Sequence, residues 1–291
     1  MADERLVLSQ LESALRADSG RALMELMRKL VLQHSVEGDL VPFLAAAEQA
    51  GLINLAGGRI QLTAFGWKVG NALREYLQWE ERGRQMPPHK AWAPALCEES
   101  FRDCDVLEIG SGFGCNLLSL QSVARSVVGV DIEPLYCELS GTLAAIAALP
   151  RPTVIRGHAE NLPRPSESAD IVLSIASIAY MRIERVLADV HRVLRPGGRA
   201  VIFTSTFSGF LRACIKEAVT LRNAKRIMRD ASVALGAAAY PLCERLLLRE
   251  FDPVCLPVFI MRSRINRAGL KVSDEDSRVK DGEVVYVAYK G

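Results

Sequence analysis

Residues 106–114 read Val-Leu-Glu-Ile-Gly-Ser-Gly-Phe-Gly, and this stretch decides the fold. An apolar segment leads into an acidic residue, three glycines follow at alternate positions, and a helical pattern begins at Asn116. Glycine tolerates positive φ and lets a ligand approach the main chain closely. A strand that ends in such a turn and continues as a helix is typical of a nucleotide-cofactor site in an α/β fold.

The spacing of the glycines distinguishes between cofactors. The dinucleotide fingerprint G-x-G-x-x-G needs a third glycine at position 115, where this chain has Cys115. That fingerprint also usually has an apolar residue where Glu108 stands. A buried carboxylate just before the turn instead suits a ligand that carries a cationic group. For this segment taken alone, a tight turn without any ligand stays open as the alternative.

Four later segments favour the cofactor site. Val127–Asp131 is an apolar strand that ends in a carboxylate, and a carboxylate at this place can accept both hydroxyl hydrogens of a ribose. With the glycine turn, the segments starting at Asp131, Val154, Asp170 and His191 resemble the ordered motifs of class I S-adenosylmethionine-dependent methyltransferases. The resemblance implies a Rossmann-like, seven-stranded α/β sheet with helices on both faces. It also implies S-adenosyl-L-methionine as cofactor and S-adenosyl-L-homocysteine as product.

The resemblance also implies roles for individual residues. Glu108 would organise the glycine turn and the amino-acid end of the cofactor, and Asp131 would hold the ribose. Ser174 and Ile175 are expected just past the fourth strand, which is the segment that starts at Asp170. They would line the methionine portion of the cofactor through backbone carbonyls. The other cofactor-binding residues that the resemblance implies are Gly110, Ser111, Gly112, Ile132, His158 and Ala159.

The chain departs from the family pattern at two places. The third motif normally has Asp where this chain has His158. This imidazole can accept a hydrogen bond from the adenine amine, stack, or face solvent. The backbone amide of Ala159 is an equal candidate for reading the adenine. After the fourth strand, residues 177–181 lack the His-His pair of many relatives. Tyr180 is therefore the predicted catalytic residue, as a phenol that positions the substrate, or else a packed aromatic with its hydroxyl at the rim.

Length and composition exclude several classes of protein. The 291 residues suit one α/β domain with an appendage, and a net charge of +2 is not typical of nucleic-acid binding. The seven cysteines form no C-x-x-C pair, so reduced thiols are expected, with no metal site and no disulfide framework. The charged N-terminus and the lack of a long apolar run predict a soluble, cytoplasmic protein without membrane association.

The N-terminal part has a pattern of its own. Residues 1–85 are predicted to form a mainly helical domain, residues 86–94 a linker, and residues 95–291 the methyltransferase domain. The predicted order is helices at 5–16, 21–33 and 38–49, two strands around Gly57-Gly58, and a helix capped by Thr63 that runs to about Glu81. This order resembles winged-helix domains.

The charges of this winged-helix-like domain are unsuited to DNA. The third helix would read bases, but its charged residues are Asp39 and Glu48, and residues 1–90 hold eleven basic and eleven acidic side chains. We therefore predict a dimerisation or substrate-covering module, which leaves a homodimer open and involves no nucleic acid. The alternative is a winged-helix transcriptional regulator whose methyltransferase-like domain senses a ligand.

Residues 207–262 are predicted to be a helical lid, since insertions after sheet strands lie over the ligand crevice. Four basic residues of this segment share one helix face, which either contacts an anionic substrate or is simply solvated: Arg222, Lys225, Arg226 and Arg229. The predicted function is methyl transfer to a small-molecule acceptor, in a secondary-metabolite or natural-product pathway. The sequence leaves N-, C- and O-methylation open.

Overall fold

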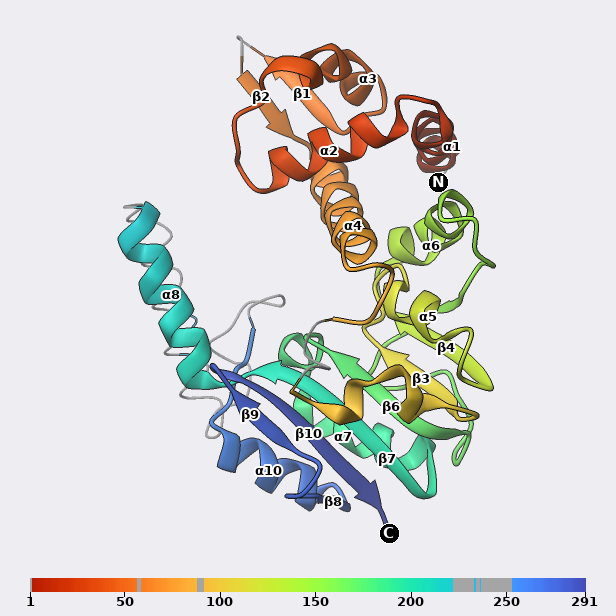
Figure 1. Ribbon diagram of the computed structural model, residues 1–291, viewed down its shortest axis with the longest axis vertical. Coiled ribbons are helices and arrows are strands. Elements are labelled where there is room, and N and C mark those ends of the chain that lie inside the picture. Colours follow the sequence, from red (N-terminus) through yellow and green to blue (C-terminus); the bar gives the residue numbers. More distant parts are fainter. Residues whose placement is uncertain (1, 57–58, 88–91, 222–232, 234–235, 237–252) are drawn as a thin grey trace. The chain divides into compact units, whose positions relative to one another are not determined.

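The protein is described here from a computed structural model, which covers residues 2–56, 59–87, 92–221, 233, 236 and 253–291 (Figure 1). The chain divides into two compact units. The smaller unit consists of residues 1–85 together with 134–151, and the larger unit consists of residues 86–133 and 152–291. Helix α6 (Pro134–Ile146) is thus grouped with the N-terminal residues.

The larger unit is built around an eight-stranded sheet in the order β5-β4-β3-β6-β7-β10-β8, with β9 paired to β10 (Figure 1). The first five strands of this path are parallel, and β10 pairs antiparallel with β7, β8 and β9. The predicted seven strands correspond to the continuous path, and β9 is an additional short strand. The strands are β3 (Asp105–Ile109), β4 (Ser126–Asp131), β5 (Thr153–Arg156), β6 (Ala169–Ile175), β7 (Leu194–Ser205), β8 (Leu270–Val272), β9 (Arg278–Lys280) and β10 (Glu283–Lys290).

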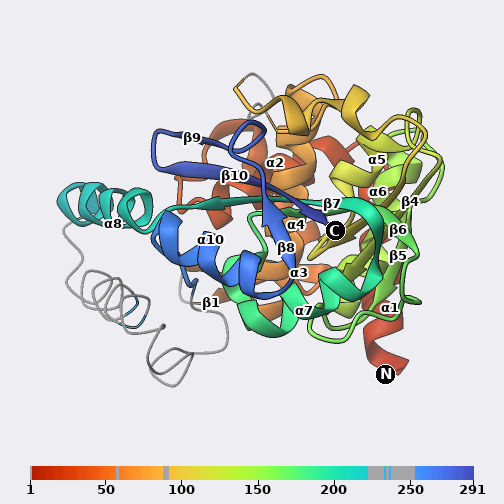
Figure 2. The same ribbon diagram turned by 90° about the horizontal axis from the view of Figure 1, so that it is seen from below.

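Alternating side chains of these strands form an apolar core on each face of the sheet, because successive residues of a strand point to opposite sides. On one face, Leu107 and Val172 pack with α7 (Ile183–Val193) and α10 (Val258–Arg267). On the other face, their neighbours pack with α5 (Cys115–Leu120) and with the 3-10 helices η3 (Pro94–Leu96) and η4 (Glu98–Phe101). Figure 2 shows α5 on the opposite side of the strands from α7 and α10. The predicted helices on both faces are confirmed.

The motif segment that starts at His191 contains Pro196-Gly197-Gly198, which does not form a separate turn before the strand. Residues 196–198 lie inside β7, which pairs Leu194 with Ala169 and then Arg199 with Ile171, with a shift of register between the two pairs. Gly197 has a φ of +75°, which glycine adopts without strain. The segment is therefore an irregularity near the start of the strand, and regular pairing begins at Arg199.

The smaller unit contains α1 (Ala2–Arg16), α2 (Gly20–Val31), α4 (Ala64–Glu81) and a two-stranded sheet of β1 (Ile53–Ala56) and β2 (Arg59–Leu62). The two strands pair antiparallel as predicted, while the Gly57-Gly58 turn lies outside the described residues. Thr63 caps α4 as predicted. Its Oγ1 accepts the N–H of Gly66 at 2.8 Å and donates to the carbonyl of Gly51 at 2.7 Å.

The prediction of one continuous helix over 38–49 was wrong. The chain forms a 3-10 helix, η1 (Gly38–Phe43), and then the short α3 (Leu44–Gln49). Pro42 lies inside this segment, and a proline has no N–H to donate and crowds the preceding turn of an α-helix. In α3, Glu48 accepts the backbone N–H of Leu55 at 2.9 Å, so this acidic side chain holds the first strand of the hairpin.

The predicted lid is only partly within the described residues. Its beginning forms α8 (Phe207–Leu221), and its end returns through residues 253–257. The basic residues at positions 222–229 lie outside the described part of the chain. Among the helices that the structure describes, none combines the length and the apolar character needed to cross a bilayer. The same residues contain no group of His, Cys, Asp and Glu side chains suited to a metal ion.

Candidate functional site

The predicted site residues come from the carboxyl ends of four neighbouring strands. The glycine turn follows β3, Asp131 ends β4, and His158 lies two residues after β5. Tyr180 ends the 3-10 helix η5 (Ile178–Tyr180), which follows β6. Because these four strands are parallel, their carboxyl ends lie along one edge of the sheet, where α/β proteins bind ligands (Figure 1).

Asp131 bonds to the glycine turn with one carboxylate oxygen and to the segment after β4 with the other. Oδ2 accepts the N–H of Gly112 at 2.8 Å, and Oδ1 accepts the N–H of Glu133 at 2.9 Å. The N–H of Gly110 donates to the carbonyl of Val130 at 2.8 Å, so backbone bonds also tie the turn to β4. Each carboxylate oxygen can accept more than one hydrogen bond. Asp131 can therefore hold the turn and still accept hydrogens from a ribose.

The environment of Asp131 disfavours its charge. The residue is 9% exposed, and burial raises the pKa of its carboxyl above the ordinary value. The N–H groups of Glu133 and Gly112 lower the pKa but do not cancel the effect of burial. Hydroxyl donors from a bound ligand would add hydrogen bonds to the ionised form and so favour it.

Glu108 is almost completely buried, with 1% exposure, in the middle of the sheet. Its Oε1 accepts a hydrogen bond from Nδ2 of Asn116 at 2.7 Å. Asn116 is the second residue of α5, the helix that leaves the glycine turn, so this bond links the strand before the turn to the helix after it. The sequence interpretation did not assign a role to Asn116. The sequence feature that could have indicated this role is an amide side chain in the first turn of the helix, within reach of a buried carboxylate.

Ser174 is placed differently from its prediction. It lies inside β6, which ends at Ile175, and its side chain is completely buried. Its Oγ is 2.9 Å from Oγ of Ser177, which donates to the carbonyl of Ile109 at 2.7 Å. The two hydroxyls therefore join the end of β6 to the end of β3, directly before the glycine turn. Ser177 was missed in the sequence, since no local pattern marks a contact between residues so far apart in the chain.

The turn itself leaves little room for side chains. Gly110, Gly112 and Gly114 have φ values of +64°, +55° and +90°, which glycine adopts readily. A Cβ atom added to Gly110 would lie 2.4 Å from Cβ of Ser177. The side chain of Ser111 is turned toward β4, where a Cβ on Gly129 would lie 2.4 Å from its Oγ. Ser111 therefore offers a ligand its backbone rather than its hydroxyl.

The remaining predicted residues differ in exposure. Ile132 and Tyr180 are large side chains that are 47% and 48% exposed, and His158 is exposed while Ala159 is 9% exposed. Ile132, next to Asp131, thus presents an apolar surface at the carboxyl edge of the sheet. The exposed imidazole of His158 is consistent with each of its predicted alternatives.

The loop after His158 is held by α7. Arg192 donates to the carbonyl of Arg164 at 2.8 Å and to that of Leu162 at 3.1 Å. Asp189 orients this guanidinium, with 2.6 Å between its Oδ1 and Nε of Arg192. This pair was not predicted as part of the site, and it fixes the segment that carries the third motif.

Comparison with known proteins agrees with this geometry. Residues 107–202 match the family described as "Methyltransferase domain". A phthiotriol/phenolphthiotriol dimycocerosates methyltransferase of Mycobacterium leprae is 41% identical over 96 residues, which is 32% of this chain and 34% of that protein. An uncharacterized methyltransferase of Mycobacterium bovis is 34% identical over 137 residues, or 47% of this chain and 51% of that protein. The chain thus aligns with about a third to a half of the length of these curated relatives.

A solved structure has the same fold. A SAM-dependent methyltransferase from Methanosarcina mazei superposes with a TM-score of 0.50 at 20% identity, over 71% of this chain and 98% of that chain. The fold, the ordered motifs and the carboxyl-edge site resemble those of class I S-adenosylmethionine-dependent methyltransferases, and residues 107–202 match a methyltransferase domain. S-adenosyl-L-methionine is the cofactor of this domain, and the acceptor oxygens of Asp131 beside the glycine-rich turn fit the ribose of that molecule.

Proposed function

We propose that the protein transfers a methyl group from S-adenosyl-L-methionine to a small-molecule acceptor of the natural-product or lipid type. The observation that carries the proposal is the Asp131 carboxylate, buried at the carboxyl end of β4 and bonded to the N–H of Gly112 in the turn. The acceptor class is supported by the relative from Mycobacterium leprae, whose name specifies methylation of phthiotriol and phenolphthiotriol dimycocerosates.

In this proposal the chain's own residues position the reactants. S-adenosyl-L-methionine supplies an electrophilic methyl group on a sulfonium sulfur. Asp131 accepts hydrogen bonds from the ribose, and Glu108, held by Asn116, keeps the turn in the shape that receives the amino-acid end. Ile132 lies against the adenine ring, which His158 or the amide of Ala159 reads. The backbone at Ser174 and Ile175 lines the methionine portion.

Tyr180 is the proposed contact to the acceptor. It lies on the same sheet edge as the cofactor residues, and nearly half of its surface is exposed. Its phenol would orient the acceptor by a hydrogen bond, and the rate would come mainly from holding the nucleophile in line with the methyl carbon. Acceptors that are already nucleophilic, which give N- or C-methylation, fit this arrangement, as does O-methylation driven by proximity.

For residues 1–85 we infer a winged-helix-like module that mediates dimerisation or covers the substrate. The inference is supported by the order of helices and hairpin. It is also supported by Glu48, an acidic side chain that is bonded to the hairpin and would repel the phosphates of DNA. Sedimentation equilibrium of the full chain tests the dimer, and a gel-shift assay tests the regulator alternative. Tight, sequence-specific DNA binding would reverse the ranking of the two functions.

Titration calorimetry with S-adenosyl-L-methionine and S-adenosyl-L-homocysteine tests the central proposal. We expect both to bind the wild-type protein, and Asp131→Ala to weaken binding at least tenfold, because ribose hydroxyls would be left without their acceptor (about 1.4 kcal/mol for each tenfold change). Asp274→Ala, at a side chain that is 81% exposed, is the matched control and should bind like wild type. Failure of the wild-type protein to bind either molecule would refute the function, and full affinity in Asp131→Ala would remove this residue from the site.

A further inference from the structure

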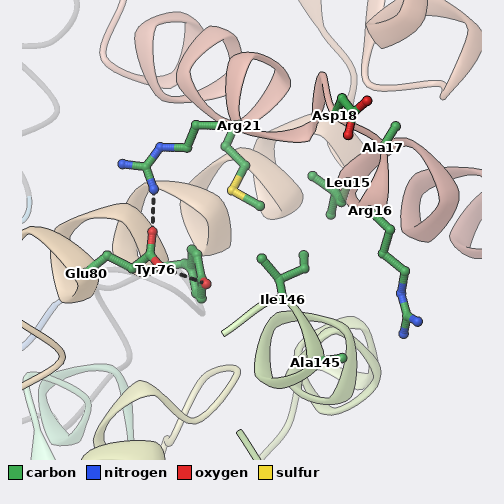
Figure 3. Close-up of a pocket in the computed structure, with 10 residues that line it drawn as sticks. Leu15, Arg16, Ala17, Asp18, Arg21, Tyr76, Glu80, Ala145 and Ile146 are labelled. Atoms are coloured by element: carbon green, nitrogen blue, oxygen red, sulfur yellow. Dashed lines mark hydrogen bonds and ion pairs between the residues drawn. The ribbon is translucent and has the colours of Figure 1, made fainter. Parts of the chain in front are cut away.

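The smaller unit contains a cavity that none of the predicted cofactor-binding residues lines (Figure 3). Its volume is about 440 Å³, within the range of small-molecule sites in proteins. Its walls come from four helices of this unit, with Leu15 from α1, Met24 from α2, Tyr76 from α4 and Ile146 from α6. The cavity thus exists because residues 134–151 pack with the N-terminal helices.

The inner wall of this cavity is apolar. Leu15, Met24 and the ring of Tyr76 have exposures of 3%, 2% and 0%, so they belong to the packed core of the unit. Ala145 and Ile146 continue this apolar surface along α6, where Ala145 is exposed at the opening. A hydrocarbon group that enters the cavity would therefore exchange water for apolar contacts, at roughly 25 cal/mol per Å² of buried surface.

Some of the charged side chains that line the cavity are paired with opposite charges in the described part of the chain, and others are not. Glu80 pairs with Arg21, accepts a hydrogen bond from the hydroxyl of Tyr76 at 3.1 Å and lies 3.4 Å from the guanidinium of Arg84. Figure 3 shows Arg21 and Glu80 on one side of the cavity and Arg16 on the other, where its side chain extends toward α6. Asp18 also lines the cavity, and Figure 3 shows its carboxylate beside Ala17, apart from the guanidinium of Arg16.

Of the two arginines that line the cavity, Arg21 is paired with Glu80, so the guanidinium of Arg16 is the one available to pair with a ligand. It makes no ion pair with any carboxylate that the structure describes. A cationic ligand would meet Arg16 at the opening. Two carboxylates line the cavity: Glu80 already accepts from three donors among the described residues, and Asp18 lies apart from the guanidinium of Arg16. The chemistry of the walls therefore selects an anion with an apolar body.

We propose that this cavity is a second ligand site, which binds a small amphipathic carboxylic acid. The apolar body lies against Leu15, Met24 and Ile146, and the carboxylate pairs with the guanidinium of Arg16. The proposal concerns the smaller unit alone and stands whether or not the larger unit catalyses methyl transfer.

Calorimetric titration of the full-length protein with octanoate, octanol and octylamine at neutral pH tests the site. These probes share one apolar body and differ in charge. We expect octanoate to bind about fivefold more tightly than octanol, since an exposed ion pair contributes a modest amount, and octylamine to bind most weakly. Equal affinity for octanoate and octanol would overturn the assignment of an acid, and a lack of octanoate binding would overturn the site.

Two substitutions locate the binding. Ala145→Trp fills the opening from an exposed position and should weaken octanoate binding at least tenfold, whereas Ala45→Trp, at an exposed alanine of α3 outside the cavity, should leave it unchanged. Arg16→Ala should weaken octanoate about fivefold and leave octanol unchanged. Titration with S-adenosyl-L-homocysteine should give the same affinity in all three variants. Octanoate binding that is equal in the two tryptophan variants would refute this location.

Discussion

The glycine turn allows a quantitative prediction through Gly110→Ala. At a φ of +64°, an alanine pays about 1–2 kcal/mol for the left-handed conformation. Its Cβ would also lie 2.4 Å from Cβ of Ser177 and 2.8 Å from Oγ of the same residue, and displacing a packed group typically costs about 1–3 kcal/mol. We therefore expect the free energy of unfolding to fall by about 2–5 kcal/mol.

Gly197→Ala is the matched control for this prediction. Gly197 has a similar φ of +75° in the same unit, but an added Cβ would meet nothing within 4 Å. This variant should lose only the conformational part, about 1–2 kcal/mol. Urea unfolding followed by circular dichroism measures both losses, and the difference between them isolates the contacts of the added Cβ, of which those with Ser177 are the shortest.

A double-mutant cycle makes the reasoning refutable. Ser177→Gly removes the two nearest atoms that the new methyl group would meet and leaves Cε of Met181 at 3.0 Å. Gly110→Ala should therefore cost about 1–3 kcal/mol less in this background than in the wild-type protein. S-adenosyl-L-homocysteine affinity should fall in Gly110→Ala, because the displaced turn carries the N–H groups that shape the site. Additive unfolding energies, or equal losses for the Gly110 and Gly197 variants, would show that the turn does not pack as described.

Three further predictions follow from single contacts. Thr63→Ala should lower the free energy of unfolding by about 1 kcal/mol in a thermal melt, since the Thr63 side chain caps α4; an unchanged melt would contradict this. Asn116→Ala should weaken S-adenosyl-L-homocysteine binding about tenfold in calorimetry, because Glu108 loses the donor that orients it; wild-type affinity would exclude this role. Hydrogen bonds from Arg125 hold the pKa of Asp105 well below its ordinary value, so the stability that Asp105 contributes is complete above about pH 4 and is lost as the pH falls through the lowered pKa. Arg125→Ala should therefore move acid unfolding to higher pH, and an unmoved transition would refute the linkage.

The sequence predicted those parts of the molecule that depend on local patterns. The buried parallel strands appear as short apolar runs, and the turn after β3 is marked by glycines that the backbone requires. Asp131 could be assigned because a carboxylate that ends the neighbouring parallel strand must lie beside that turn. The order of elements then placed His158 and Tyr180 at the same edge.

The parts that the sequence did not predict depend on contacts between distant segments. The hydroxyl of Ser177 reaches the carbonyl of Ile109 because β6 pairs with β3, a pairing that no local period specifies. Residues 38–49 have apolar residues at helical spacing, but Pro42 prevents a continuous α-helix, so backbone chemistry overrode the periodicity.

In the larger unit, the bonds that hold the glycine turn are distinct from those that hold the insertion. The N–H of Phe207 donates to the carbonyl of Leu256 at 3.3 Å, so the two described ends of the insertion meet at the end of β7. From there, the N–H of Val254 donates to the carbonyl of Ala179 at 2.6 Å, directly beside Tyr180. The bond from Gly112 to Asp131 and the bond from Ser177 to Ile109 hold the turn, and neither of these two bonds involves the insertion. Under the proposed function, changes in residues 253–257 should therefore alter the choice of acceptor while the affinity for S-adenosyl-L-homocysteine stays the same.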